Sequence, residues 1–324
     1  MSDDTGARPA TERMLLDPEE IVARQAYDIP RVRLPGRDTV FRPRAARLRT
    51  LAETSTIGDY LRFVATIADA QQQQLDSYPA LPLPPVERME QNRKFGMPPL
   101  NAVSLQRAPA WRTILRSLLT TVLHSELPAP LRVTLEQFAT QVDDYFEAQA
   151  SKLLSANLQG LNVAVAPLLA AALQVYFVGM ASQFTLEDVP ALGEASLCPC
   201  CGSRATASLA RIGAQEAGYR YLSCALCATE WHMVRVKCTQ CLSTKDIHYQ
   251  SIDDGRPGRE HAVKAECCDA CNTYLKILYL DRDPNLDACA DDLASVALDV
   301  LVGETGRPGC GVNYMLVQGE TAAP

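Results

Sequence analysis

Four pairs of cysteines, each pair separated by two residues, are the part of this sequence best suited to chemistry. A two-residue gap lets two sulfurs bind one metal ion, and two such pairs complete a four-sulfur site. Pairing neighbours along the chain gives C-x2-C-x22-C-x2-C followed by C-x2-C-x26-C-x2-C. The sequence therefore predicts two metal sites: site 1, made by Cys198, Cys201, Cys224 and Cys227, and site 2, made by Cys238, Cys241, Cys268 and Cys271.

The spacing does not choose the metal. A closed four-thiolate site suits zinc or a single iron, and it leaves no open position for a substrate. The C-x2-C-x2-C-x3-C-P run of four-iron ferredoxins is absent from the sequence. Small modules bury little apolar area, so we expect the bound metals to supply folding free energy and to be structural. The alternative is that the metals also have a redox role.

Four cysteines stand outside the two sites: Cys200, Cys267, Cys289 and Cys310. We assign Cys268 rather than its neighbour to site 2, because this choice keeps the two-residue gap. We expect the four remaining cysteines to be small buried residues or free thiols. A redox couple of Cys200 and Cys267 beside the metals is the alternative. The cysteine count fills both sites, so the nearby His232 and His248 are not expected to bind metal.

The elements that position the cysteines are expected to be short strands. Strand-forming residues predict a hairpin over Ala207–Gly213 and Gly218–Ser223, and further strands over Thr229–Val236, Ile247–Ile252 and Tyr274–Leu280. The chain runs from Thr229–Val236 directly to Cys238, so we expect both metal modules to share this strand. Such spacing is typical of zinc ribbons and rubredoxins, and it predicts one rubredoxin-like module over residues 193–236 and a second over 237–283.

The rest of the chain reads as helical. We expect an arm over residues 1–44, with a short helix after Asp17 and an extended stretch over Ile29–Pro43. An all-α domain over 45–192 follows. Apolar periodicity predicts helices within Ala45–Leu75, broken at Ile57–Asp59, and over Pro109–Leu123, Pro128–Leu154 and Leu161–Ala181, with a proline-rich linker at Tyr78–Pro85. Residues 284–324 should form a helix over Pro284–Leu301, capped by Asp283, and a tail.

Charge and polarity narrow the class of protein. The net charge is −7, and residues 198–271 hold nine Lys or Arg and eight Asp or Glu. Each divalent ion bound by four thiolates would add about −2 to that module, which disfavours a nucleic-acid partner. Leu161–Ala181 is long enough to span a membrane, but Asn162, Pro167 and Gln174 interrupt it, so we expect a buried helix. The polar start at Met1–Arg13 shows no secretory signal, and we expect a cytoplasmic protein.

Three stretches resemble a known family. Cys198–Gly202, Tyr221–Cys238 and Val263–Tyr279 closely resemble the FdhE formate dehydrogenase accessory proteins, and Asp291–Ser295 and Gly58–Phe63 match as well. The resemblance implies a helical bundle followed by two tandem rubredoxin-like modules and a C-terminal helix. It also implies iron in both four-cysteine sites, with zinc as the alternative. Cys200 and Cys267 depart from the family pattern.

The resemblance implies a non-enzymatic factor. Such a protein binds the catalytic subunit of a molybdopterin-dependent respiratory formate dehydrogenase and helps its maturation after translation. The alternatives are a zinc-ribbon nucleic-acid binder and a rubredoxin-like electron carrier. We expect a formate dehydrogenase subunit as partner, no nucleic acid and no membrane insertion, with a homodimer possible.

Overall fold

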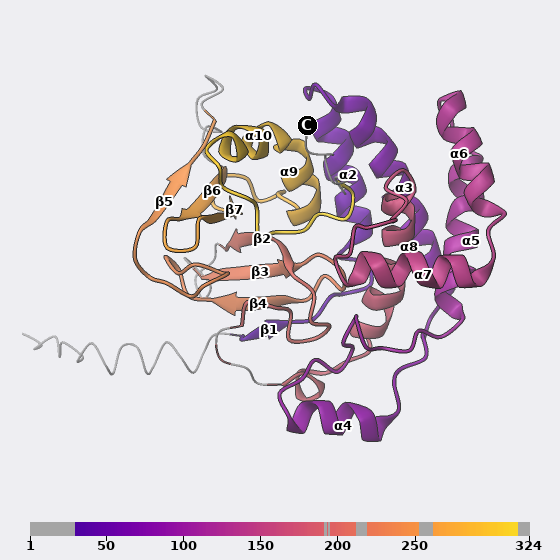
Figure 1. Cartoon of the computed structure of the whole chain (residues 1–324), viewed down its shortest axis with the longest axis horizontal. Helices are drawn as coiled ribbons and strands as arrows, with labels where there is room; N and C mark the ends of the chain where they lie inside the picture. The colour runs from indigo at the N-terminus through magenta and orange to yellow at the C-terminus, as the bar shows by residue number, and fades with distance from the viewer. Residues whose placement is uncertain (1–29, 191–192, 194, 212–218, 253–261, 317–324) are drawn as a thin grey trace, which may run out of the picture. The chain divides into compact units, whose positions relative to one another are not determined.

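Helices come first and strands second in the computed structural model, which describes residues 30–190, 193, 195–211, 219–252 and 262–316 (Figure 1). The helix expected after Asp17 lies outside these residues. The two-residue strand β1 (Val32–Arg33) precedes a helical region, and a β-sheet region with two four-cysteine clusters follows it. Helices close the described chain. The predicted order of an all-α region, a region of short strands that holds the Cys-x-x-Cys pairs, and helix at the C-terminal end is confirmed.

The helical region consists of seven α-helices and one short 3-10 helix. They are α2 (Phe41–Ala52), α3 (Gly58–Ser77), α4 (Val86–Lys94), α5 (Ala110–Leu123), α6 (Ala129–Ala139), α7 (Asp143–Leu154), α8 (Ala166–Ala181) and η1 (Leu186–Asp188). Helix α8 is the centre of this region, since 15 of its 16 residues are buried and α3, α5 and α7 pack against it. The predicted buried helix is confirmed. Among the described residues, no helix combines the length and hydropathy needed to cross a membrane.

Two helix boundaries are explained by local chemistry. The predicted break before Gly58 is confirmed, and a Cβ at this position would lie 2.5 Å from the Ala52 carbonyl oxygen, so only glycine fits where α3 begins beside α2. The single helix predicted over Pro128–Leu154 was wrong. The chain breaks after Ala139, and α7 starts with Asp143 and Asp144 in its first turn, where acidic side chains favour a helix N-terminus.

A seven-stranded mixed sheet makes up the second region. Its strands are β2 (Ala205–Ala210), β3 (Arg220–Cys224), β4 (Glu230–Met233), β5 (Ile247–Gln250), β6 (Val263–Cys268) and β7 (Thr273–Tyr279), together with β1. The order is β1-β4-β3-β2-β7-β6-β5, and β2 pairs with β7 in parallel while the other pairs are antiparallel. The predicted hairpin is β2–β3. The strand β6 was not predicted.

The two metal modules meet through β2 and β7, not through a shared strand. Strand β4 ends at Met233 and pairs with β1 and β3, so the expectation that Thr229–Val236 serves both modules was wrong. A buried ion pair also crosses between the modules: Arg220 of β3 lies 2.7 Å from Glu266 of β6, and both side chains are almost fully buried. The first module thus consists of β2–β4 and the second of β5–β7, joined side by side in one sheet.

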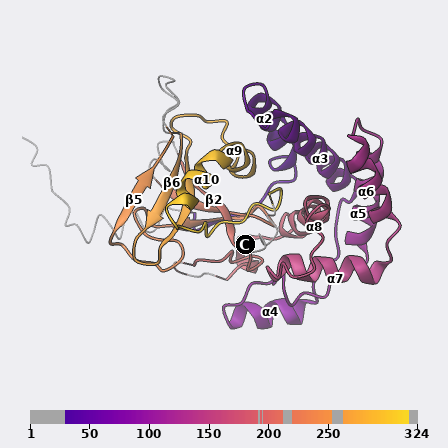
Figure 2. The ribbon, with the colours of Figure 1, turned by 45° about the horizontal axis from the view of Figure 1, so that its top comes forward.

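Two short helices, not one, follow the last strand. They are α9 (Ala288–Ala294) and α10 (Val296–Glu304), and Asp287, not Asp283, is the N-cap, because its carboxylate accepts hydrogen bonds from the backbone N–H groups of Cys289 and Ala290. Helix α9 packs on β2 and β7 and also against α2, as the turned view makes visible (Figure 2). It therefore links the sheet to the start of the helical region.

Candidate metal centres

The structure gathers the four sulfurs predicted for site 1 into one cluster. Cys198 comes from the loop before β2, Cys224 from the end of β3 and Cys227 from the turn that leads to β4. The Sγ atoms of Cys198 and Cys227 lie 3.6 Å apart, and those of Cys201 and Cys224 lie 3.4 Å apart. All four Sγ atoms are within 4.8 Å of one another, and all four cysteines are free thiols.

Site 2 repeats this arrangement at the other end of the sheet. Cys268 ends β6, Cys271 lies in the turn to β7, and the other two cysteines come from the loop between β4 and β5. The Sγ atoms of Cys238 and Cys271 are 3.6 Å apart, and those of Cys241 and Cys268 are 3.7 Å apart. These four Sγ atoms also lie within 4.8 Å of one another.

The four cysteine pairs share one backbone turn. In each, the residue after the second cysteine adopts a positive φ, between 54° and 76°, and these residues are Gly202, Ala228, Leu242 and Asn272. In three pairs the N–H of the first cysteine donates to the carbonyl five residues on, for example from Cys198 to Ser203 at 2.9 Å. This curl aims backbone N–H groups at the first sulfur, as with Cys227 N–H to Cys224 Sγ at 3.4 Å.

A threonine hydroxyl supports the second pair of each site. Thr229 Oγ1 lies 3.2 Å from Cys227 Sγ, and Thr273 Oγ1 lies 3.1 Å from Cys271 Sγ. A hydroxyl at this distance can donate to a thiolate and fix its direction. The repeated Cys-x-Thr spacing is the sequence signal that identifies these two residues.

The donor sets fit a tetrahedral metal ion. Four sulfurs at about 2.3 Å from a zinc ion would lie about 3.8 Å from one another, close to the contacts of 3.4–3.7 Å found here. Burial raises the pKa of the Cys198 and Cys224 thiols well above their ordinary value. In site 2, hydrogen bonds from Thr273 and the neighbouring thiols outweigh the effect of burial and lower the pKa of Cys271 to about 7. Sulfurs packed this closely share protons, and a divalent cation can replace those protons.

The structure also decides where the neighbouring cysteines point. Successive residues of a strand face opposite sides of a sheet. Cys268 accordingly reaches the cluster, while the Cys267 sulfur lies 3.8 Å from the Ala265 carbonyl oxygen in a separate apolar cluster with Tyr274 and Leu298. Cys200 is fully buried beside site 1. Because the two lie in different modules, the structure does not bring Cys200 and Cys267 together as a couple.

The remaining candidates lie outside both clusters. Within the described residues, the potential metal-binding groups contain cysteines alone. His232 stacks edge-on against Tyr221, and His248 Nδ1 lies 3.4 Å from an Asp269 carboxylate oxygen. Cys289 is buried on α9, and Cys310 is partly buried, with its sulfur 3.6 Å from Thr239 Oγ1.

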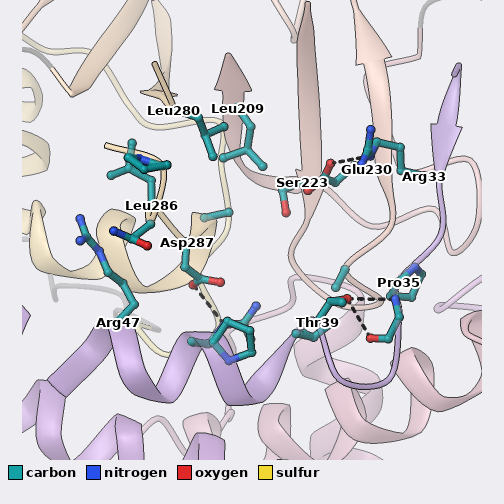
Figure 3. Close-up of a pocket in the computed structure, with 18 of the residues that line it drawn as sticks. Arg33, Pro35, Thr39, Arg47, Leu209, Ser223, Glu230, Leu280, Leu286 and Asp287 are labelled. Atoms are coloured by element: carbon teal, nitrogen blue, oxygen red, sulfur yellow. Dashed lines mark hydrogen bonds and ion pairs between the residues drawn. The ribbon is translucent and has the colours of Figure 1, made fainter. Parts of the chain in front are cut away.

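A polar cavity of about 940 Å³ lies between α2, the ends of β2–β4 and the chain that leads to α9 (Figure 3). Each of its arginines is paired with a carboxylate. Arg44 lies 3.2 Å from Asp287, and Arg47 lies 2.6 Å from Asp291 and 2.9 Å from Asp283. Glu230 pairs with Arg33 at 3.7 Å and also with Arg211. The cavity is therefore close to charge-balanced. Its ion pairs join the first described helix to α9, which gives Asp291 a structural role.

Comparison with known proteins identifies the family. Family models described as FdhE N-terminal, FdhE central domain and FdhE C-terminal domain match residues 29–194, 197–235 and 236–316. The chain belongs to the FdhE family. It is 40% identical over 298 residues to a protein FdhE homolog of Cronobacter sakazakii and to protein FdhE of Salmonella dublin, covering 92% of this chain and 94% of each relative.

The FdhE fold is known from a crystal structure. The FdhE protein from Pseudomonas aeruginosa matches with a TM-score of 0.83 and 40% identity, over 90% of this chain and 100% of that one. The FdhE central-domain match contains the four cysteines of site 1, and the C-terminal match contains those of site 2. The resemblance drawn from the cysteine-containing stretches is thus confirmed along almost the whole chain.

Proposed function

We propose that this chain is a non-enzymatic accessory factor that binds the catalytic subunit of a molybdopterin-dependent respiratory formate dehydrogenase. It supports the maturation of that subunit after translation, in the cytoplasm. The observation that carries the proposal is the match to FdhE over 92% of the chain. The eight cysteines of the four Cys-x-x-Cys pairs, here called knuckles, also form two clusters.

We further propose that the eight cysteines each contribute a thiolate to a bound metal. Site 1 uses Cys198, Cys201, Cys224 and Cys227, and site 2 uses Cys238, Cys241, Cys268 and Cys271. The resemblance to the FdhE family favours iron, and zinc is the alternative because the four-sulfur donor set accepts either metal. When bound, the metal supplies folding free energy and, if it is iron, a one-electron redox couple. The protein's residues bind it, direct the sulfurs through Thr229 and Thr273, and exclude water.

A closed four-sulfur centre supports an accessory role over an enzymatic one. A catalytic zinc site keeps an open position for water or substrate, whereas each of these sites already holds four protein sulfurs. The net charge of −7 also disfavours a nucleic-acid partner. The chain would therefore act by contact with its client.

The test is capture of the client from an anaerobic lysate with the tagged chain. Wild type is compared with Cys268→Ser/Cys271→Ser, and Cys310→Ser serves as the matched control because this cysteine lies outside both clusters. The proposal expects the wild type and the control to retain a formate dehydrogenase catalytic subunit, and the double variant to retain less. Retention of nucleic acid, or no formate dehydrogenase with any form, would contradict it.

A further inference from the structure

The two four-cysteine clusters differ in how far solvent reaches them. In site 1 all eight residues of the two knuckles, 198–201 and 224–227, are buried, and its four cysteines are at most 4% exposed. In site 2 the knuckles 238–241 and 268–271 are partly open, because Gln240, Cys241, Asp269 and Ala270 are exposed and Cys271 is partly exposed. A small molecule can therefore reach site 2 through Cys241 and Cys271, while Cys238 and Cys268 are at most 4% exposed.

The helical region covers site 1 through direct hydrogen bonds. The N–H groups of Leu100 and Ala102 donate to the carbonyls of Cys200 and Cys201 at 3.0 and 2.9 Å. From α8, the Gln174 side chain donates to the carbonyl of Ala225 at 2.7 Å. The site 1 cysteines belong to the same apolar core as α3, α5 and α8. Opening site 1 therefore requires the helical region to separate from the sheet.

Site 2 has no comparable cover among the described residues. It stands at the far end of the sheet, where β5 is the edge strand. Its first knuckle is followed by Leu242, an exposed leucine held at φ +60°, a conformation that costs a non-glycine residue free energy. Site 1 contains a comparable residue, Ala228 at φ +57°, so backbone strain does not distinguish the two sites. Site 2 differs from site 1 in its exposure.

We propose that the two sites have different roles: site 2 is the exchangeable metal centre, and site 1 is a permanent structural one. The inference rests on metal binding by both clusters and not on the identity of the client. In exchange, an incoming ligand displaces the thiolates of site 2 one by one and takes the divalent ion unchanged in oxidation state, and the released thiolates take up protons from solvent to become thiols. Site 1 releases its metal only when the core opens.

The expected signature is a large difference in release rate. Local opening of exposed segments costs almost no free energy, whereas opening of a core approaches the free energy of global unfolding. Metal release from site 2 should therefore be at least about hundredfold faster than from site 1. The difference should disappear in denaturant, where both clusters are equally open.

The experiment uses the full-length zinc-loaded protein, with two ions per chain verified by native mass spectrometry. Excess 4-(2-pyridylazo)resorcinol reports zinc release, and N-ethylmaleimide with peptide mapping reports which cysteines become reactive during each phase. We expect two phases of equal amplitude, with Cys238, Cys241, Cys268 and Cys271 labelled in the fast one. Cys271→Ser should remove the fast phase, and the matched variant Cys227→Ser should remove the slow one.

One phase, two phases with the site 1 cysteines labelled first, or fewer than two ions per chain would each overturn the proposal. The peptide mapping is done on the wild type, so the result stands even if Cys227→Ser fails to fold. No formate dehydrogenase is present in the assay. A biphasic release combined with failure to capture a client would therefore refute the proposed function alone.

Discussion

Gln174 offers the sharpest test of how the helical region supports site 1. It is the one polar side chain in the middle of the apolar helix α8, and it is 4% exposed. Its amide nitrogen donates to the Ala225 carbonyl at 2.7 Å, and its amide oxygen accepts from Gln71 at 2.9 Å. A Gln174→Met substitution keeps the length of the side chain and removes both hydrogen bonds.

The expected loss of stability follows from the hydrogen-bonding groups that the substitution leaves without a partner. The buried Ala225 carbonyl loses its side-chain donor, at about 1–3 kcal/mol, while Gln71 keeps a second partner, the Ala171 carbonyl at 3.0 Å. Gln174→Met should therefore lower the free energy of unfolding by about 2 kcal/mol, or the Tm by about 3 °C for a chain of 324 residues. Urea titration followed by circular dichroism measures the first quantity. Zinc release from site 1 should become faster, while release from site 2 should not change.

Gln73→Met is the matched control, because Gln73 lies on α3 with its side chain exposed. The same chemical change there should alter the free energy of unfolding by less than about 0.5 kcal/mol. If Gln174→Met is as mild as the control, or if it accelerates release from both sites equally, the buried network does not couple α8 to site 1 and the reasoning is refuted.

Three further outcomes can be checked on the purified protein. Burial raises the pKa of Cys289 to about 12, so at pH 8 iodoacetamide should label it about a thousandfold more slowly than an ordinary thiol, and fast labelling in the native state would contradict its placement. Gly202→Ala should destabilise the protein by about 1–2 kcal/mol, because Gly202 has a positive φ. Gly303 lies in open space on α10, so Gly303→Ala should stabilise the protein by about 0.5–1 kcal/mol. Calorimetry that gives both changes the same sign would refute this. Despite burial, hydrogen bonds from Trp111 and two arginines lower the pKa of Glu147. The stability that its carboxylate adds is therefore present above about pH 4.3 and is lost as pH falls further. Glu147→Gln should lose less stability than the wild type on acidification, and an unchanged dependence of stability on pH would count against this.

The cysteine clusters could be predicted because their signal is local. A Cys-x-x-Cys pair fixes both sulfurs within one turn of backbone, and the chain needs only to bring two turns together. The α8 helix was predictable for a similar reason: an apolar run of that length has to be buried or to span a membrane. In both cases, the residues that decide the structure are close in sequence.

The missed features depend on partners far away in the chain. Strand β6 contains the charged residues Lys264 and Glu266, so its sequence resembles that of an exposed polar segment. Glu266 can be buried because Arg220 of the other module pairs with it. The parallel pairing of β2 with β7 likewise joins segments more than 60 residues apart. Whether a site is covered also cannot be read from spacing. Sites 1 and 2 have almost the same pattern of cysteines, and only the helical region makes them different.

The most direct test of the proposed maturation role is formate dehydrogenase activity in a host that lacks this chain. Formate-dependent dye reduction is measured together with the amount of catalytic subunit, and the wild-type chain, Cys268→Ser/Cys271→Ser and Cys310→Ser are each supplied again. We predict that the catalytic polypeptide is made but inactive without the chain, and that wild type and Cys310→Ser restore activity while the double variant does not. Full formate dehydrogenase activity in the absence of the chain would contradict a role for it in maturation.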